Sequence, residues 1–336
     1  MAVADRPRLV ALRALGLGDL LTAAPALRAL ARAYPEHDRV LAAPAPLAPL
    51  VRLVEPGTRL VPTDELAPLP PDLHGADVTV NLHGRGAQSH RLLLAASPRR
   101  CLWFAHDAVP ESRGAPRWCP GEHEPRRWAR MLSELGIPAD AGDLDLEPPP
   151  GPGLAAARGA TLVHPGAAGP ARRWPPERFA RVVAAERAAG RRVVLTGSTA
   201  EVGLVQGIAR RVGLPGERVL AGRTDLSDLA RAVAAAARVV CGDTGVAHLA
   251  TALGTPSVLL FGPTPPAEWG PPGGSRLSLP HRNSGVAKKD LTPKARHIVL
   301  WRGPAPGGGD PHAEVPDPAL LALEADDVIA ALADLP

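Results

Sequence analysis

The sequence contains few cysteines and no long uncharged run, and these absences exclude several classes of protein. The three cysteines, Cys101, Cys119 and Cys241, are odd in number and show neither CxxC nor Cys/His ligand spacing. We therefore expect no disulfide framework and no zinc site, and the pattern fits a reducing cytoplasm. No uncharged run reaches the length of a membrane-spanning helix. The sequence thus predicts a soluble cytoplasmic protein whose contact with a membrane is at most peripheral.

Aromatic residues and lysine are also scarce. Aromatics make up 3% of the 336 residues, and because there are only three lysines, nearly all positive charge is arginine. The net charge of +4 suits an anionic small molecule, an anionic membrane surface or nucleic acid. Arginine binds phosphate well, although a general arginine bias explains its abundance equally well. The arginines are dispersed and no aromatic residues are interleaved with them, so we expect no nucleic-acid partner.

Alanine, leucine and valine, by contrast, are abundant, and apolar segments of two kinds alternate along the chain. The length exceeds the usual size of one hydrophobic core and predicts two domains. Short strands that alternate with helices predict an α/β fold with doubly wound parallel sheets. The segment 147–153, EPPPGPG, can continue neither a helix nor a central strand and marks the boundary. The expected parts are a domain at 1–150, a domain at 151–316 with a cleft between the two, and a C-terminal helix at 317–336 that could pack across either.

The expected strands and helices follow from the apolar runs and the glycine turns between them. The first domain opens with a strand, a glycine turn at 15–18 and a helix at 20–33 that Pro25 could kink. The stretch from 263 to 316 is expected to be rich in loops. The predicted strands lie at 9–12, 40–43, 60–61, 78–82, 101–104, 161–164, 192–196, 218–220, 238–241 and 257–261.

The stretch 241–264, CGDTGVAHLATALGTPSVLLFGPT, is the most informative part of the chain. A glycine turn here leads from an apolar strand into a helix that begins near Val246. The N-terminus of such a helix offers unpaired N–H groups and the positive end of its dipole, so it favours phosphate. In open α/β sheets, ligands bind at this edge. The residues that converge there are Asp243, Thr244, Gly245 and His248.

Two further strand ends in the second half carry polar residues and glycine. His164 and Gly166 follow one strand, and Arg172 stands shortly before the next helix, where arginine can clamp a diphosphate through charge-assisted hydrogen bonds. A solvated surface position for Arg172 is the alternative. Thr196, Gly197 and Glu201 follow another strand, and the Glu201 carboxylate could bond a ribose diol or favour the helix dipole.

The first strand-to-helix turn carries the sequence Gly16-Leu17-Gly18-Asp19. A dinucleotide fingerprint needs a third glycine where Leu21 stands, which disfavours a nicotinamide enzyme. Asp19 could cap the helix that follows, or its carboxylate could act as a general base on a hydroxyl. Both possibilities remain open from the residues alone.

The loop after the strand at 78–82 carries further hydrogen-bonding side chains. These are His83, Arg85, Gln88 and Ser89. They could contact a substrate at the same edge of the sheet, or they could belong to a solvated loop.

Together these segments resemble glycosyltransferase family 9, the family of the heptosyltransferases. Six motifs stand in the family's order, and no residue arrangement for another catalytic class competes with them. The matching segments are Leu15-Gly16-Leu17-Gly18-Asp19 with Pro25, His164-Pro165-Gly166, Arg172-Arg173-Trp174-Pro175, Leu195-Thr196-Gly197 with Glu201, Asp243-Thr244-Gly245 with His248, and Phe261-Gly262-Pro263-Thr264.

The resemblance implies a GT-B fold of two Rossmann-like domains and inverting sugar transfer without a catalytic metal or other cofactor. The donor, a nucleotide-diphosphate sugar such as ADP-heptose, would bind the second domain, and a glycan or glycolipid acceptor of cell-envelope synthesis the first. Asp19 would be the general base, with Gly18 and the 83–89 loop at the acceptor. Arg172, where the family often has lysine, would neutralise the diphosphate with Thr244 and Gly245, Glu201 would hold the ribose, and Asp243 and His248 would shape the donor pocket.

A different class remains as the alternative. A non-catalytic module that binds a nucleotide or a partner protein could retain the same fold. The presence of Asp19 together with the donor-side residues argues against that alternative. The donor sugar and the acceptor are not determined by these motifs, and the segment 282–312 matches no part of the family pattern.

Overall fold

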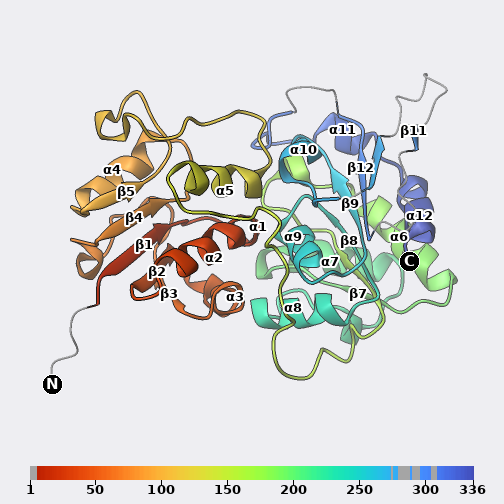
Figure 1. Cartoon of the computed structure of the whole chain (residues 1–336). Coiled ribbons are helices and arrows are strands. Elements are labelled where there is room, and N and C mark those ends of the chain that lie inside the picture. The colour runs from red at the N-terminus through yellow and green to blue at the C-terminus, as the bar shows by residue number, and fades with distance from the viewer. Residues whose placement is uncertain (1–5, 274, 279–287, 290–295, 304–308) are drawn as a thin grey trace. The chain divides into compact units, whose positions relative to one another are not determined.

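The computed structural model describes residues 6–273, 275–278, 288–289, 296–303 and 309–336 (Figure 1). Its contacts divide the chain into two compact units, unit 1 at Met1–Leu146 and unit 2 at Glu147–Pro336. The proline-rich segment 147–153, where the sequence predicts a boundary, begins at this division. Each unit has its own sheet and its own core, and each is described by itself.

Unit 1 is built on a five-stranded parallel sheet in the order β3-β2-β1-β4-β5. The chain adds strands to one side of β1 and then returns to add β4 on its other side, so the sheet is doubly wound. The strands are β1 (Arg8–Leu12), β2 (Asp38–Ala43), β3 (Thr58–Pro62), β4 (Val78–Asn81) and β5 (Arg100–Leu102). The α-helices are α1 (Leu17–Thr22), α2 (Ala24–Ala33), α3 (Ala48–Val54), α4 (Ala87–Ala95) and α5 (Glu124–Glu134), and short 3-10 turns are η1 (Ala45–Leu47), η2 (Pro71–Leu73) and η3 (Pro110–Ser112).

Unit 2 contains a seven-stranded sheet in the order β11-β10-β12-β9-β8-β6-β7, parallel except for β11. It too reverses direction, here between β6 and β8. The strands are β6 (Thr161–His164), β7 (Val193–Leu195), β8 (Arg238–Gly242), β9 (Ser257–Phe261), β10 (Ser275–Ser278), β11 (Lys288–Lys289) and β12 (His297–Trp301). The α-helices are α6 (Pro176–Ala188), α7 (Val202–Arg211), α8 (Leu226–Ala235), α9 (Gly245–Ala252), α10 (Pro266–Trp269), α11 (Pro318–Leu321) and α12 (Ala325–Asp334), with 3-10 turns η4 (Pro170–Arg172), η5 (Thr199–Glu201) and η6 (Gly216–Arg218).

The predicted parallel, doubly wound sheets are confirmed, and the structure corrects several element boundaries. The expected helix at 20–33 is two helices, α1 and α2, separated at Ala23. Pro25 lies in the first turn of α2, where a missing N–H costs nothing, so it helps to begin a helix and does not kink one. The expected strand at 218–220 is only a single bridge between Val219 and Leu195.

The stretch from 263 to 316 contains more regular structure than expected. Strand β12 pairs with β9 along its whole length, and four of its residues are buried. Its sequence HIVLW follows several prolines and glycines, and for that reason the stretch was predicted to form loops. Of the unassigned stretch 282–312, residues 282–287, 290–295 and 304–308 lie outside the described residues.

The C-terminal helix lies within unit 2. The expected single helix is divided into α11 and α12, because Glu324 begins α12 with a capping box in which its side chain and that of Asp327 bond reciprocally to backbone N–H groups. Helix α12 packs on α6 and on strands β9 and β12. Its apolar face thus closes the core of unit 2.

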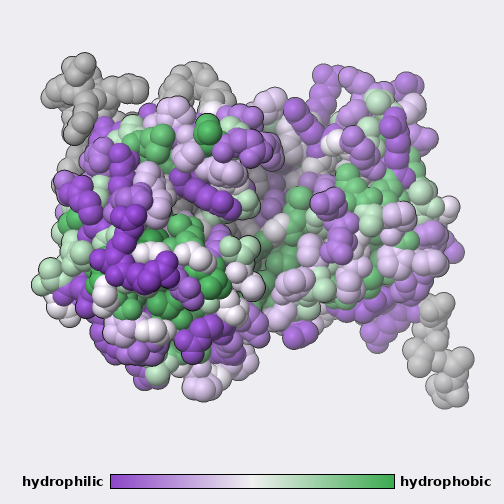
Figure 2. Space-filling model, turned by 180° about the vertical axis from the view of Figure 1, so that it is seen from behind, coloured by the Kyte–Doolittle hydropathy of each residue, from purple (hydrophilic) through white to green (hydrophobic). Residues whose placement is uncertain are grey.

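The two cores are aliphatic, as the composition predicts. In unit 2, Val163, Val240 and Val258 on adjacent strands pack with helix residues such as Phe179 and Val328. Hydrophilic residues cover much of the outer face seen in the space-filling view (Figure 2). Among the residues that the structure describes, no helix has both the length and the apolar character needed to cross a membrane.

Candidate active site

In unit 2, the predicted polar residues gather at the carboxyl ends of β6, β7 and β8. Strands β6 and β8 are neighbours, and His164 at the end of β6 lies opposite Cys241 in β8. The order of the strands reverses between these two, and such a reversal leaves a crevice where ligands bind in open α/β sheets. The loops that carry the predicted donor residues leave the sheet at this position.

His164 and Thr196 form a buried pair across β6 and β7. The Nδ1 atom of His164 lies 3.0 Å from the Thr196 hydroxyl oxygen, and both side chains are buried. Burial lowers the pKa of His164, and the negative charge of Glu201 opposes this effect. The pair therefore presents a neutral imidazole at the edge of the sheet.

Glu201 lies directly over Gly166. A Cβ atom on Gly166 would collide with the Glu201 carboxylate, so only glycine leaves room for this approach. The carboxylate also accepts a hydrogen bond of 2.7 Å from the backbone N–H of Ser198 at its Oε2 atom. Gly197 is also constrained, because a Cβ there would lie 2.8 Å from a methyl group of Val205 in α7. The loops after β6 and β7 therefore approach each other where Glu201 lies over Gly166.

Arg172 ends the 3-10 turn η4 beside the end of β8. A Cβ atom on Gly242 would lie 3.4 Å from the carbonyl oxygen of Arg172, which shows how closely the two loops approach. The Nε–H of Arg172 is buried and has no hydrogen-bond partner among the described residues. A buried donor without a partner is costly, and an anionic ligand at this point would satisfy it.

Helix α9 begins at the same edge. Thr244 is its N-cap, and its hydroxyl accepts a hydrogen bond of 3.3 Å from the N–H of Val246. Asp243 is buried, and its N–H donates to Leu260 in β9. Further along the helix, the ring of His248 meets Trp269 edge-on with centroids 5.9 Å apart. The N–H groups of the first turn and the guanidinium of Arg172 supply positive potential for an anion.

Unit 1 has its own reversal of strand order, between β1 and β4, where Leu12 lies opposite Asn81. Asp19 belongs to the first turn of α1 and does not cap it, because the N-cap position is Gly16. The capping role that the sequence left open is therefore wrong. The Asp19 side chain is 27% exposed, and its Oδ1 atom accepts a hydrogen bond of 3.3 Å from Arg13. Gly18 precedes it in the same half-buried turn.

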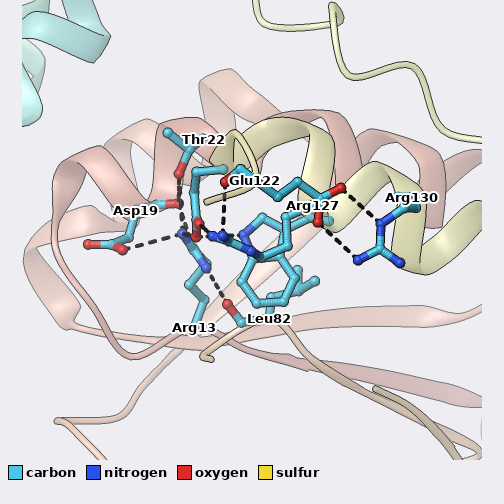
Figure 3. Close-up of polar contacts among 9 residues, drawn as sticks. Arg13, Asp19, Thr22, Leu82, Glu122, Arg127 and Arg130 are labelled. Atoms are coloured by element: carbon cyan, nitrogen blue, oxygen red, sulfur yellow. Dashed lines mark hydrogen bonds and ion pairs between the residues drawn. The ribbon is translucent and has the colours of Figure 1, made fainter. Parts of the chain in front are cut away.

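Arg13 is the centre of a polar network that the sequence motifs do not reveal (Figure 3). It follows β1 directly and is only 2% exposed. Its guanidinium donates to the backbone oxygens of Asp19 (2.5 Å) and Leu82 and to side-chain oxygens of three residues. These three are Asp19, Thr22 and Glu124, the last at 3.0 Å. The only signal in the sequence is a charged residue at the end of an apolar strand, and nothing there identifies its partner Glu124.

The charges of Arg13 and Asp19 also act on His83. Burial lowers the pKa of His83, the positive charge of Arg13 lowers it further, and Asp19 opposes them. The N–H of His83 donates to the Asn81 side chain, which fixes the loop after β4. Asp19 and His83, which the sequence places 64 positions apart, are thus brought to one edge of the sheet.

The remaining residues of the 83–89 loop differ in exposure. Arg85 and Gln88 are exposed, so both can reach a ligand. Ser89 is 1% exposed, and its hydroxyl donates to the carbonyl oxygen of Gly86 while it accepts from Asn81. This pairing favours a structural part for Ser89 over the expected contact with an acceptor.

A metal ion would need a cluster of acidic, histidine or cysteine ligands. Among the residues that the structure describes, no group of three or more such side chains is arranged to hold one. The predicted lack of a metal or other cofactor stays a prediction.

A comparison with protein-family models gives the decisive observation. Residues 139–290 match the model of glycosyltransferase family 9 (heptosyltransferase). The predicted resemblance to this family is confirmed. The matched region contains every predicted donor-side residue, from His164 to His248, and lies almost entirely in unit 2.

Curated relatives support the family over a smaller share of the chain. The chain is 36% identical over 109 residues to lipooligosaccharide heptosyltransferase 2 of Haemophilus influenzae and 35% identical over 101 residues to lipopolysaccharide heptosyltransferase 2 of Escherichia coli. These alignments span 31% and 29% of the chain, and the same shares of the relatives. The chain thus aligns with less than a third of either curated family member.

Solved structures are similar over nearly the whole chain. A glycosyltransferase family 9 structure from Veillonella parvula superposes with a TM-score of 0.72 at 20% identity and covers 98% of this chain and 97% of its own. The structure of E. coli ADP-heptose lipopolysaccharide heptosyltransferase II gives 0.69 at 21% identity and covers 97% of both chains. The expected GT-B fold is confirmed, and it extends beyond the region that the family model matches.

Proposed function

We propose that this protein is an inverting glycosyltransferase that moves a heptose or a similar sugar from a nucleotide-diphosphate donor to a hydroxyl of a glycan or glycolipid acceptor. The observation that carries the proposal is the edge of unit 2, where the backbone of Arg172 closely approaches Gly242, shortly before α9 begins. The buried Nε–H of Arg172 has no partner among the described residues. The family match over residues 139–290 includes this edge. ADP-heptose is the donor we propose first, because similar structures include E. coli heptosyltransferases named for that donor or solved with ADP.

The donor side supplies the chemistry of the leaving group. Breaking the bond between the anomeric carbon and the diphosphate leaves the electron pair and a negative charge on the nucleotide. Arg172 and the N–H groups of Thr244 and Gly245 would stabilise this charge where it develops, in place of a metal ion. His164 and Gly166 would shape the floor of the pocket, with Thr196 and Gly197 behind them, while Glu201 binds the ribose. Asp243 and His248 would complete the far side.

The acceptor side supplies the nucleophile. Asp19 would accept the proton of the acceptor hydroxyl as its oxygen attacks the anomeric carbon from the face opposite the diphosphate. Gly18 would lie at the acceptor beside the carboxylate, and His83, Arg85 and Gln88 would contribute hydrogen bonds. Attack from the opposite face inverts the anomeric configuration.

We further propose that the reaction serves cell-envelope polysaccharide synthesis in the cytoplasm, with the protein at the inner face of the plasma membrane. This proposal follows from the acceptors of the named relatives, which are lipopolysaccharide and lipooligosaccharide heptosyltransferases. A glycolipid acceptor would need only peripheral contact with the membrane.

A thermal-shift panel of ADP, GDP, UDP, TDP, CDP and NADH tests the donor class. A ligand that binds the folded state alone raises the midpoint according to its concentration relative to its Kd. We expect one nucleoside diphosphate, ADP first, to raise the midpoint and NADH to leave it unchanged. A shift with NADH alone would contradict the proposal. Nucleotide release from ADP-heptose that depends on an added acceptor then tests transfer, and no release with any sugar nucleotide across a broad acceptor panel would favour a non-catalytic binding module.

A further inference from the structure

Arg13 has more carboxylate partners than the neutralisation of one buried charge requires. Arg13 contacts two carboxylates, Asp19 on α1 and Glu124 on α5, although one would balance its charge. The second carboxylate is 4% exposed and comes from a helix that lies 105 residues further along the chain than Asp19. Figure 3 shows the contact between the Arg13 guanidinium and the Asp19 carboxylate.

We propose that Arg13, anchored by Glu124, is a positioning residue that holds the Asp19 carboxylate in the orientation needed to take the proton of an acceptor hydroxyl. The inference rests on the proposed function, in which Asp19 is the base. It adds two residues to the acceptor side, neither of which touches the reacting atoms.

Glu124 is fully engaged and so forms a firm anchor. Its Oε1 atom accepts from Arg13 at 3.0 Å and from the indole N–H of Trp128 at 2.8 Å, while its Oε2 atom accepts from Arg127. Trp128 also places its ring 5.0 Å from the guanidinium carbon of Arg13. Arg13 is therefore held from one side by α5 and cannot turn away without breaking a buried ion pair.

Asp19, by contrast, is engaged at one oxygen only. Its Oδ1 atom faces Arg13, and its Oδ2 atom accepts no hydrogen bond within the described part of the chain. The side chain is 27% exposed, so this second oxygen is open to a ligand. A carboxylate fixed at one oxygen and open at the other is suited to accept a proton in a defined direction.

The charges of the network also suit a group that gains a proton. With Asp19 ionised, the charges of Arg13, Arg127, Asp19 and Glu124 sum to zero, and His83 faces them as a largely neutral ring. When Asp19 takes up the proton, Arg13 keeps Glu124 as its partner. The guanidinium therefore stays paired and in place in both states.

A purely structural cross-link between α5 and β1 is the competing explanation, and kinetics can separate the two. The variants are Arg13→Gln, Arg13→Lys and Glu124→Gln, assayed well below their melting temperatures with ADP-heptose and heptose-deficient lipopolysaccharide. The matched control is Arg28→Lys, since Arg28 forms a 2.6 Å ion pair with Asp143 in the same unit, away from Asp19.

We expect Arg13→Gln and Glu124→Gln to lower kcat by roughly tenfold or more, with KM for ADP-heptose within about twofold of the unaltered protein. Arg13→Lys should restore part of the rate because it keeps the charge. Rates equal to those of Arg28→Lys, or a KM for ADP-heptose that rises as much as kcat falls, would overturn the proposal.

A measurement without substrate keeps this inference separate from the proposed function. If the unaltered protein transfers no heptose, the proposal that it is a heptosyltransferase fails. Titration of the His83 ring by NMR still tests whether Arg13, Asp19 and His83 lie together. Arg13→Gln should raise the pKa of His83 and Asp19→Asn should lower it, because the first removes a positive and the second a negative neighbour. An unchanged His83 pKa in Arg13→Gln would overturn the grouping on which the inference depends.

Discussion

The two sheet edges use polar residues in opposite ways. In unit 1, the charged groups nearest the reversal of strand order are paired with one another, as Arg13 is with Asp19 and Glu124. In unit 2, the buried pair at the corresponding place is the uncharged His164 and Thr196, and the Nε–H of the nearby Arg172 is buried without a partner among the described residues. Unit 1 also buries nitrogens without a described partner, among them His83 Nδ1 and Arg127 Nε. Its carboxylates are nevertheless paired within the unit, whereas unit 2 leaves an arginine donor for which the described part of the chain supplies no carboxylate partner.

Under the proposed function, this difference suits each edge to its task. A base must keep its geometry whether or not it carries a proton, and internal pairing provides that. A binding site for a diphosphate must leave donors unpaired until the ligand arrives, because a protein partner would compete with it. The same topology would then support two kinds of chemistry through the pairing of its loop residues.

The largest expected effect is that of Asp19→Asn, which removes the carboxylate that we propose takes the proton of the acceptor hydroxyl. Transfer should fall by roughly 10² or more, while ADP binding stays within a few-fold. Rate measurements paired with calorimetric titration of ADP test this. Asp143→Asn, at another partly exposed carboxylate paired with an arginine of unit 1, is the control. Full activity in Asp19→Asn would remove the residue from the role of base.

The next effect tests the unpaired donor of unit 2. Arg172→Ala removes charge-assisted hydrogen bonds that contribute about 1.5 to 3 kcal/mol, so the Kd for ADP should rise by roughly ten- to a hundredfold. The neighbouring Arg173 is exposed, and its side chain donates to the backbone oxygen of Ala167, so Arg173→Ala should leave binding nearly unchanged. Equal affinities of the two variants would contradict the comparison between the edges.

A smaller effect is expected from the close approach of the unit 2 loops. Gly166→Ala would push the Glu201 carboxylate away and release the N–H of Ser198. Loss of such a cap costs about 1 kcal/mol of unfolding free energy, and ADP binding should weaken with it. Gly203→Ala, where a Cβ meets nothing within 4 Å, is the control and should stabilise helix α7 slightly. Urea unfolding measures both, and a Gly166→Ala protein as stable as the control would disprove the contact.

The smallest expected effect concerns pH. Burial lowers the pKa of both His164 and His83, so the unfolded chain takes up protons that the folded protein does not. Stability should therefore be full above about pH 7 and fall as the pH drops below the ordinary histidine value near 6.5. Urea midpoints measured at about pH 8, 6 and 5 test this sign. His164→Gln should flatten the dependence more than His83→Gln does, since His164 is the more deeply buried.

The sequence predicts features of the fold and of the site that depend on local signals, but not those that depend on contacts between residues far apart along the chain. Strand positions and the loops after them were predictable, because apolar runs and glycine turns are local signals. The residues that the motifs predict for the donor side therefore lie at one edge of the sheet, and their role stays a prediction. The sequence does not indicate Glu124, because its partner Arg13 is 111 positions away and an acidic residue at the start of a helix looks like any other.

Local sequence patterns also gave wrong predictions where the burial of a side chain or strand determines its role. Ser89 stands among polar residues, yet the first turn of α4 carries its hydroxyl inward to Asn81. Strand β12 was hidden by its neighbours, although its own five residues are almost wholly apolar. In both cases the outcome depends on which face of an element meets the core, which only the assembled unit reveals.

The bond from Arg13 to Leu82 bears on how this chain can change in evolution. Arg13 donates a hydrogen bond to the main-chain oxygen of Leu82. Every amino acid has this oxygen, so position 82 can vary among apolar residues without loss of the contact. Positions 13 and 124 have less freedom, because their side chains pair with each other in a buried contact and the loss of either would leave the charges of the network unbalanced. Among descendants of a common ancestor, we expect these two positions to be exchanged together or not at all, as a covarying pair that links the first strand of the chain to a helix a hundred residues later.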